Sequence, residues 1–94
     1  MYNFMNTDSK MQKDLLARLR RIEGQVRGVQ KMIEDNRDCG EIVIQLGAIK
    51  AAVNRVGFSV LACHLASTIH EGIENNEDPA KQMDEFMAVL KKFS

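Results

Sequence analysis

The sequence predicts an all-α fold, and three observations support this prediction. Apolar residues recur at intervals of three and four positions over most of the chain, which is the period of an amphipathic helix. The 94 residues include a single proline, and no run of Val, Ile or Thr alternates cleanly with polar residues as a half-buried strand would. A domain of this size hides only about 60 to 65% of its unfolded surface, so association with further copies would stabilise it.

The first helix is expected over residues 10–35, after a flexible tail over residues 1–9. Its apolar positions, spaced by fours and threes, form a seam that we expect to be core. The seam comprises Leu15, Leu19, Ile22, Val26, Val29 and Ile33. A second stripe on helix surface that the seam does not use consists of Arg18, Arg21, Gln25 and Gly28.

The second helix is expected over residues 38–71. Asp38 can cap its first turn, and Glu41, three residues later, completes an aspartate version of the capping box. Apolar residues at heptad spacing form its seam: Ile42, Leu46, Ile49, Val53, Val56, Val60 and Cys63. At about 1.5 Å per residue such a helix is nearly 50 Å long. A single protomer cannot cover it, so it must pack on the first helix and on another chain.

The third helix is expected over residues 79–93, because Asp78 can act as the N-cap before a proline at the first helical position. We expect it to bury Met83, Phe86 or Met87, Leu90 and Phe93. The three helices together form a single helical domain over residues 10–94, without internal repeats.

Charge is distributed unevenly, although 13 basic and 13 acidic residues cancel over the whole chain. The segment from Lys10 to Lys31 carries seven cations against two anions, whereas the segment from Glu71 to Glu85 carries six acids against one lysine. The first segment suits a polyanionic partner, and the second would repel one. No uninterrupted apolar run approaches the roughly 18 to 20 residues of a membrane span, and the first residues do not resemble a secretory signal, so a cytoplasmic location is expected.

The two cysteines occupy different environments. Cys63 and His64 are adjacent, but successive helical side chains are turned by about 100°, so the two do not face one small centre. Cys63 falls on the apolar seam, where a cysteine behaves as a small hydrophobic residue. Cys39 falls in the first turn of the second helix, where unpaired N–H groups favour a thiolate; it is either a reactive ligand or a boundary cysteine without a role.

Cys39 and His64 can meet only between subunits, since twenty-five residues of helix separate them by about 37 Å. In an antiparallel pair of second helices, position i of one chain lies near position j of the other when their sum is constant. Pairing 39 with 64 places the crossing between Ala51 and Ala52, in a stretch of small residues. Two equivalent cross-subunit Cys39/His64 sites would result, although other packings of the heptad seam remain open.

These residues carry a resemblance to a known family. The motif R-L-R-R-I-E-G-Q-V-R-G over residues 18–28, Cys39, Q-L-G-A-I-K-A-A-V-N-R over residues 45–55 and a histidine twenty-five residues after the cysteine resemble the CsoR/RcnR/FrmR family of helical bacterial repressors. The resemblance covers residues 12–93. It implies a three-helix protomer, an antiparallel four-helix-bundle dimer that assembles into a tetramer, and operator DNA that is released when an inducer binds at a cross-subunit cysteine.

The resemblance also implies the DNA contacts. The positions that match the basic surface of the family are Arg18, Arg21, Gln25, Arg55 and Lys50. Arginines along a helix can bind the phosphates of duplex DNA. The alternative is an ordinary solvated face with ion pairs such as Arg27 with Glu23.

The inducer stays open, because Thr68 stands where the copper-sensing branch has a further cysteine and the nickel branch a histidine. Three interpretations follow for the site. Cys39 and the partner's His64 bind a transition metal, such as Cu(I), Zn, Ni or Co, with Cys63 as a further candidate ligand. Alternatively, Cys39 is a reactive thiol that a sulfur or carbonyl electrophile modifies. In the third interpretation, Cys39 and Cys63 of opposing chains form a sulfur-bridged pair.

The competing class of function is a structural or protein-interaction bundle that binds neither DNA nor an inducer. It predicts no retention of specific duplex DNA. An enzyme is not expected, because the chain offers no acid/base pair, phosphate loop or nucleophile with a local base.

Overall fold

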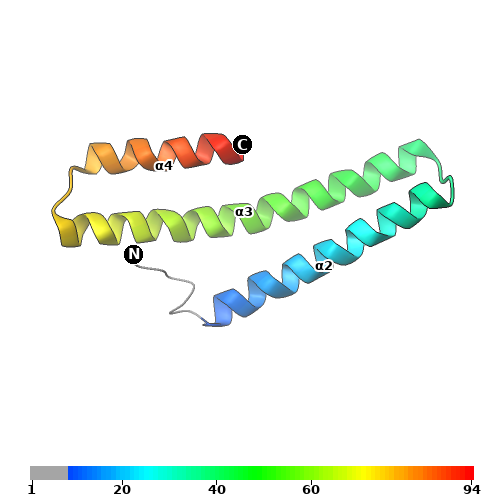
Figure 1. Cartoon of the computed structure of the whole chain (residues 1–94), viewed down its shortest axis with the longest axis horizontal. Helices are drawn as coiled ribbons and strands as arrows, with labels where there is room; N and C mark the ends of the chain where they lie inside the picture. The colour runs from blue at the N-terminus through cyan, green and yellow to red at the C-terminus, as the bar shows by residue number, and fades with distance from the viewer. Residues whose placement is uncertain (1–8) are drawn as a thin grey trace. The chain divides into compact units, whose positions relative to one another are not determined.

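The computed structural model describes residues 9–94, which form three helices (Figure 1). In chain order these are α2 (Ser9–Glu34), α3 (Cys39–Asn75) and α4 (Pro79–Phe93). No strand occurs within residues 9–94, so the prediction of an all-α, three-helix protomer is confirmed. Of the predicted tail, residues 1–8 lie outside the described part of the chain, and Ser9 already belongs to α2.

Both α2 and α3 end at an asparagine in the left-handed conformation. Asn36 and Asn76 each have φ of 56°. The N–H that follows each asparagine donates back to the helix, from Arg37 to the Met32 carbonyl at 2.9 Å and from Glu77 to the Gly72 carbonyl at 2.9 Å. This is the hydrogen bonding of a Schellman motif. The predicted end of the second helix at residue 71 was therefore wrong, because α3 continues to Asn75 and the left-handed residue that ends it is Asn76.

The start of α3 follows the prediction only in part. The Asp38 carboxylate accepts the backbone N–H of Glu41 at 3.3 Å, as an N-cap residue should. The Glu41 carboxylate does not complete the capping box, because it accepts hydrogen bonds from Arg37, the shorter at 2.7 Å. At α4 the predicted cap is confirmed, since the Asp78 carboxylate accepts the N–H of Ala80 at 3.1 Å and Pro79 opens the helix.

The chain divides into two compact units, one of residues 13–56 and one that contains residues 57–94. In the first unit, α2 runs antiparallel to the first part of α3 (Figure 1). The buried apolar residues of this unit are Leu15, Ile22, Val29 and Val56. The other members of the predicted α2 seam are exposed, with Ile33 at 58%. One neighbouring helix covers a single narrow stripe, so only every second seam position is buried.

In the second unit, α4 packs along the later part of α3. No residue of α4 is fully buried, and Phe86 and Leu90 are half-buried. Met83 is 53% exposed and Phe93 is 37% exposed, so the expectation that the third helix buries them was wrong for the single protomer. The fully buried residues among residues 57–94, Leu61 and Gly72, both belong to α3.

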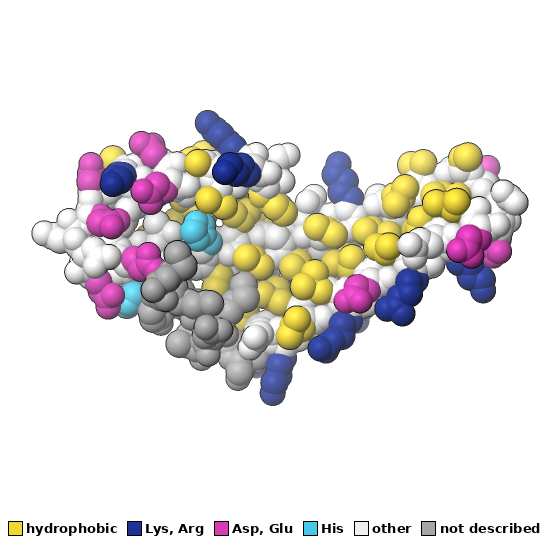
Figure 2. All heavy atoms as spheres, in the orientation of Figure 1, with side chains coloured by type: hydrophobic (Ala, Val, Ile, Leu, Met, Phe, Trp, Pro, Cys, Tyr) yellow, Lys and Arg dark blue, Asp and Glu magenta, His cyan; other side chains and the backbone are white. Residues whose placement is uncertain are grey.

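Helix α3 is long and apolar enough to cross a membrane by length and composition alone. The expectation of no membrane span rested on uninterrupted apolar runs, and α3 has none of sufficient length. A helix at the centre of a soluble helical assembly meets the same criterion. Apolar side chains gather on the visible face of α2 and α3 in the first unit (Figure 2). Leu46 and Val53 of α3 are among the exposed hydrophobic residues.

Candidate functional site: a basic concavity and a cysteine-histidine helix

A concavity of about 410 Å³ lies between α2 and α3 within residues 13–56. We call it the basic concavity, and it is lined by Asp14, Ala17, Arg18, Arg21, Ile22, Gln25, Ala52 and Arg55. Helix periodicity explains the α2 members, because positions 14, 18, 21 and 25 recur at intervals of four and three. Small side chains at Ala17 and Ala52 leave the hollow between the arginines. The structure thus brings together four of the five residues predicted to bind DNA.

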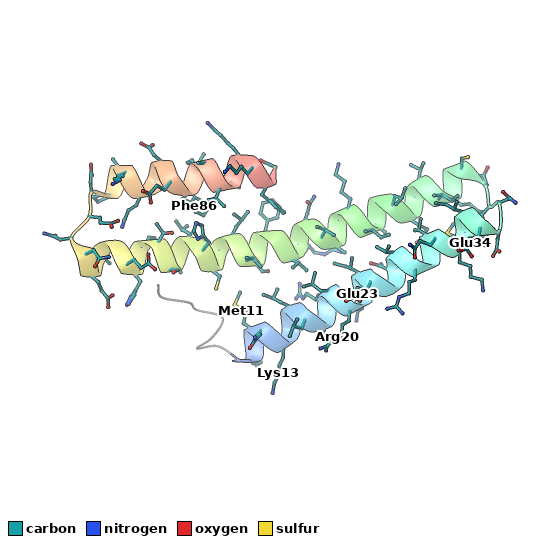
Figure 3. The ribbon with its side chains drawn as sticks, viewed as in Figure 1. Met11, Lys13, Arg20, Glu23, Glu34 and Phe86 are labelled. Carbon is teal, nitrogen blue, oxygen red and sulfur yellow. The ribbon has the colours of Figure 1, made fainter. Side chains whose placement is uncertain are left out.

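The fifth predicted residue, Lys50, is exposed on α3 and does not line the concavity. Other cations lie along the outer edge of α2 (Figures 2 and 3), among them Lys13 and Arg20. Arg27 forms the ion pair with Glu23 that the solvated-face alternative predicted, at 3.9 Å and with both side chains well exposed. Exposed pairs at this spacing contribute little stability, so Arg27 remains available to another anion.

Asp14 is a member of the basic concavity that the sequence argument missed. Its carboxylate lies 3.0 Å from Nε of Arg18, and the two side chains are about half exposed. A carboxylate four residues before an arginine on a helix is the sequence signal for such a pair. Asp14 therefore occupies one face of a guanidinium that would otherwise bind an external anion.

Gln25 is half-buried, and its Oε1 is buried without a hydrogen-bond partner among the described residues. An amide oxygen left without a donor costs about 1 to 3 kcal/mol. The same residue lines the basic concavity, although its Oε1 atom is itself shielded.

Both cysteines are free thiols, and they differ in accessibility. Cys39 is exposed in the first turn of α3, and Cys63 is half-buried further along the same helix. The carboxylate of Asp38 caps the same first turn through the Glu41 N–H, so a side chain already serves part of the positive helix end beside Cys39. Cys39 and His64 are not brought together in one protomer, since α3 continues unbroken between them.

His64 lies against α4 in the second unit. Its ring stacks on that of Phe86 with centroids 6.0 Å apart and planes 23° apart. Thr68, at the position of the missing third ligand, donates its hydroxyl to the His64 carbonyl at 2.9 Å. Sequence reasoning missed the contact with Phe86, because a helical period identifies a face and not its partner on another helix. Asp84 and Glu85, the two acids of α4 that precede Phe86, are exposed.

The Cys39 thiol and the His64 imidazole are donors of the kind that a soft or borderline metal binds, but the described part of one protomer offers too few of them at one place. A thiolate and an imidazole suit Cu(I), Zn or Ni. Within residues 9–94 of one protomer, no group of three or more His, Cys, Asp or Glu side chains is placed to hold an ion.

Comparison with known proteins identifies the family. Residues 11–92 match the model of a metal-sensitive transcriptional repressor. The copper-sensing transcriptional repressor CsoR of Bacillus subtilis is 37% identical over 91 residues, which cover 96% of this chain and 89% of CsoR. The transcriptional repressor RcnR of Citrobacter koseri is 34% identical over 77 residues, covering 82% of this chain and 81% of RcnR.

Solved structures agree with these relatives. The crystal structure of the copper-sensing repressor CsoR with Cu(I) from Geobacillus thermodenitrificans has a TM-score of 0.79 and 41% identity, covering 92% of this chain and 88% of that one. The nickel-responsive transcriptional regulator InrS has a TM-score of 0.74 and 33% identity, covering 87% of this chain and 91% of that one. This is a family of regulators and not of enzymes. With its matching sequence, helical fold and basic helix, the chain belongs to the CsoR/RcnR family of metal-sensitive transcriptional repressors.

Proposed function

We propose that this chain represses transcription by binding operator duplex DNA through the basic concavity, together with Lys50. The observation that carries the proposal is the convergence of Arg18, Arg21, Gln25 and Arg55 on one hollow. Three guanidinium groups around it can each bind phosphate oxygens in a bidentate manner. Because bacterial DNA lies in the cytoplasm, we also propose a cytoplasmic location for this chain.

We further propose that the repressor acts as an antiparallel dimer and assembles into a tetramer. Support comes from the apolar residues of α3 that one protomer leaves exposed, among them Leu46 at 48% and Val53 at 40%. Of the two alanines at the expected crossing point, Ala52 lines the basic concavity and Ala51 is exposed, so Ala51 is free to meet a second copy. Such a dimer would present the concavity twice to the DNA.

The inducer would act where Cys39 of one protomer meets His64 of the other. Metal binding is supported by the relatives named as copper-sensing and nickel-responsive. Thr68 offers no obvious third ligand, because its hydroxyl is donated to a backbone carbonyl. Modification of the exposed Cys39 by a sulfur or carbonyl electrophile is a second chemistry that these residues allow. A third is a sulfur bridge between Cys39 and the partner's Cys63, in which a polysulfide or another oxidant takes up the two electrons released.

Fluorescence anisotropy with DNA from upstream of its own gene tests the DNA interface. We expect binding that weakens steeply as salt rises, and an affinity lowered roughly tenfold or more by Arg18→Ala or Arg21→Ala, with a shallower salt dependence. Lys92→Ala is the matched control, since it removes an exposed cation of α4 outside the concavity. Equal loss in the control, or no binding at low salt, would contradict the proposal.

The inducer is tested by titrating the reduced protein with Cu(I), Zn(II), Ni(II), polysulfide and formaldehyde, and following metal content, mass and release of DNA. Cys39→Ala should abolish the response, because every interpretation of the site uses this thiol. Cys63→Ala should keep it for a metal or electrophile at Cys39 and lose it for the paired-cysteine chemistry. A full response in Cys39→Ala would exclude the site.

A further inference from the structure

Two glycines of α3 receive side chains from α4. A Cβ at Gly57 would overlap the ring of Phe93, and a Cβ at Gly72 would overlap the side-chain amide of Gln82. By contrast, a Cβ at Gly47, also on α3, would meet no atom within 4 Å. We call Gly57 and Gly72 the glycine notches, because α4 packs into α3 at both points.

Specific contacts hold each notch. At Gly72, Nε2 of Gln82 donates to the Thr68 carbonyl at 3.2 Å and to a carboxylate oxygen of Glu77 at 3.2 Å. At Gly57, Phe93 packs edge-on against Phe58, with ring centroids 5.8 Å apart and planes at 75°. A helix held at two separated points cannot slide by one turn without losing both, so the notches set the register of α4 on α3.

That register places Phe86 on His64. Phe86 lies between Gln82 and Phe93 in the sequence of α4, and it extends from α4 toward α3 (Figure 3). Its ring stacks on the imidazole at 6.0 Å and 23°. Hydrogen bonds of Thr68 fix α3 at the same place. The Thr68 carbonyl accepts a hydrogen bond from Gln82 of α4, and the Thr68 hydroxyl donates one to the His64 carbonyl.

We propose that Phe86 is a positioning residue for His64, held in place by the glycine notches. A stacked neighbour covers a face of the imidazole but leaves the plane of the ring open, and the nitrogen lone pairs that bind a metal lie in that plane. The stack therefore fixes the ring orientation without competing for the ligand atom. This inference rests on the proposed function, in which His64 meets the inducer.

Phe86→Leu tests the proposal, because it keeps an apolar side chain and removes the aromatic stack. The first readout is the proton NMR spectrum of the imidazoles, with the His64 signals assigned from a His64→Gln variant. Loss of the ring current should shift the His64 signals and leave those of His70 in place. Phe86→Tyr, which retains the ring, should keep the wild-type positions. Unchanged His64 signals in Phe86→Leu would overturn the proposal.

The second readout is affinity for Cu(I), measured by competition with a chelator. Freeing a side chain that was ordered before binding should weaken the affinity by roughly three- to tenfold in Phe86→Leu. DNA affinity without inducer should stay unchanged, and Met87→Leu, at an exposed neighbouring position of α4, should behave as the wild type. Equal affinity in Phe86→Leu and wild type would count against positioning.

Two further outcomes separate the proposals. If Phe86→Leu does not fold, Phe86→Met takes its place with the same expected results. A wild-type protein that binds no Cu(I) would refute only the copper form of the proposed function, whereas the NMR readout would still decide whether Phe86 orders His64.

Discussion

At the scale of single residues, the basic concavity combines groups that attract DNA with one that opposes it. Arg18, Arg21 and Arg55 supply positive charge, while Asp14 pairs with Arg18 at 3.0 Å. A phosphate must displace this carboxylate to use the full guanidinium. Asp14 therefore lowers the affinity for any polyanion. A lower affinity for DNA makes it easier for a repressor to release its operator.

Replacement of Asp14 by asparagine tests this role. Asp14→Asn keeps the size of the side chain and removes its charge, so we expect operator affinity to rise by about two- to fivefold at low salt. Fluorescence anisotropy over a salt series measures the change. Glu23→Gln is the control, because it removes an equivalent carboxylate outside the concavity. Equal or weaker binding by Asp14→Asn would show that the pair does not restrain Arg18.

At the scale of elements, helix length is set by left-handed asparagines. Asn76 allows α3 to continue to Asn75 and then stop, because its φ of 56° ends the helical hydrogen bonding. Asparagine tolerates this conformation better than most residues other than glycine. The turn after it leads to the Asp78 cap of α4, so the position of α4 along the chain depends on this stop.

Substitutions at Asn76 should separate conformation from side-chain chemistry. Asn76→Ala should lower the free energy of unfolding by about 1 kcal/mol, because alanine is strained at positive φ, whereas Asn76→Gly should be neutral or stabilising. Thermal unfolding measures this as a shift of about 4 to 8 °C in Tm for Asn76→Ala. Asn75→Ala, one residue earlier and still helical, should cause no comparable loss. A loss equal to that of Asn76→Ala there would contradict the explanation.

At the scale of the whole molecule, the protomer leaves much of its apolar surface uncovered. The described chain buries only Leu15, Ile22, Val29, Val56 and Leu61 among its hydrophobic residues. Five buried residues make a small core, and domains of this size often rely on association for stability. The exposed seam of α3 is the natural surface for a second copy.

A charge on that seam should disrupt the assembly. Val53→Glu places a carboxylate on a residue that is 40% exposed in the protomer and that we expect to be buried between copies. Light scattering after gel filtration should show a lower mass, and operator affinity should fall because fewer concavities act together. Asn54→Glu adds the same charge at the next position and should preserve the wild-type mass. An unchanged mass for Val53→Glu would move the interface elsewhere.

The sequence was sufficient to predict the fold class, the N-caps at Asp38 and Asp78, and the α2 stripe that carries Arg18, Arg21 and Gln25. These features depend on local rules: helical period, short-range capping and the spacing of charges along one face. The same rules could not tell which half of the α2 seam is covered, because burial depends on how many neighbours a helix has. They also placed the end of the second helix too early, since several residues near Gly72 could have ended it.

Contacts between side chains of different helices could not be predicted before the helices were packed. Three such contacts depend on the register between two helices. Arg55 shares the basic concavity with the arginines of α2, Gln82 fills the Gly72 notch and Phe86 stacks on His64. The sequence shows no motif for this register, because the glycine notches that set it are recognisable only once α4 is packed on α3. Most residues of the site could therefore be named from the sequence, but Asp14 and the contacts between helices became visible only when the helices were packed.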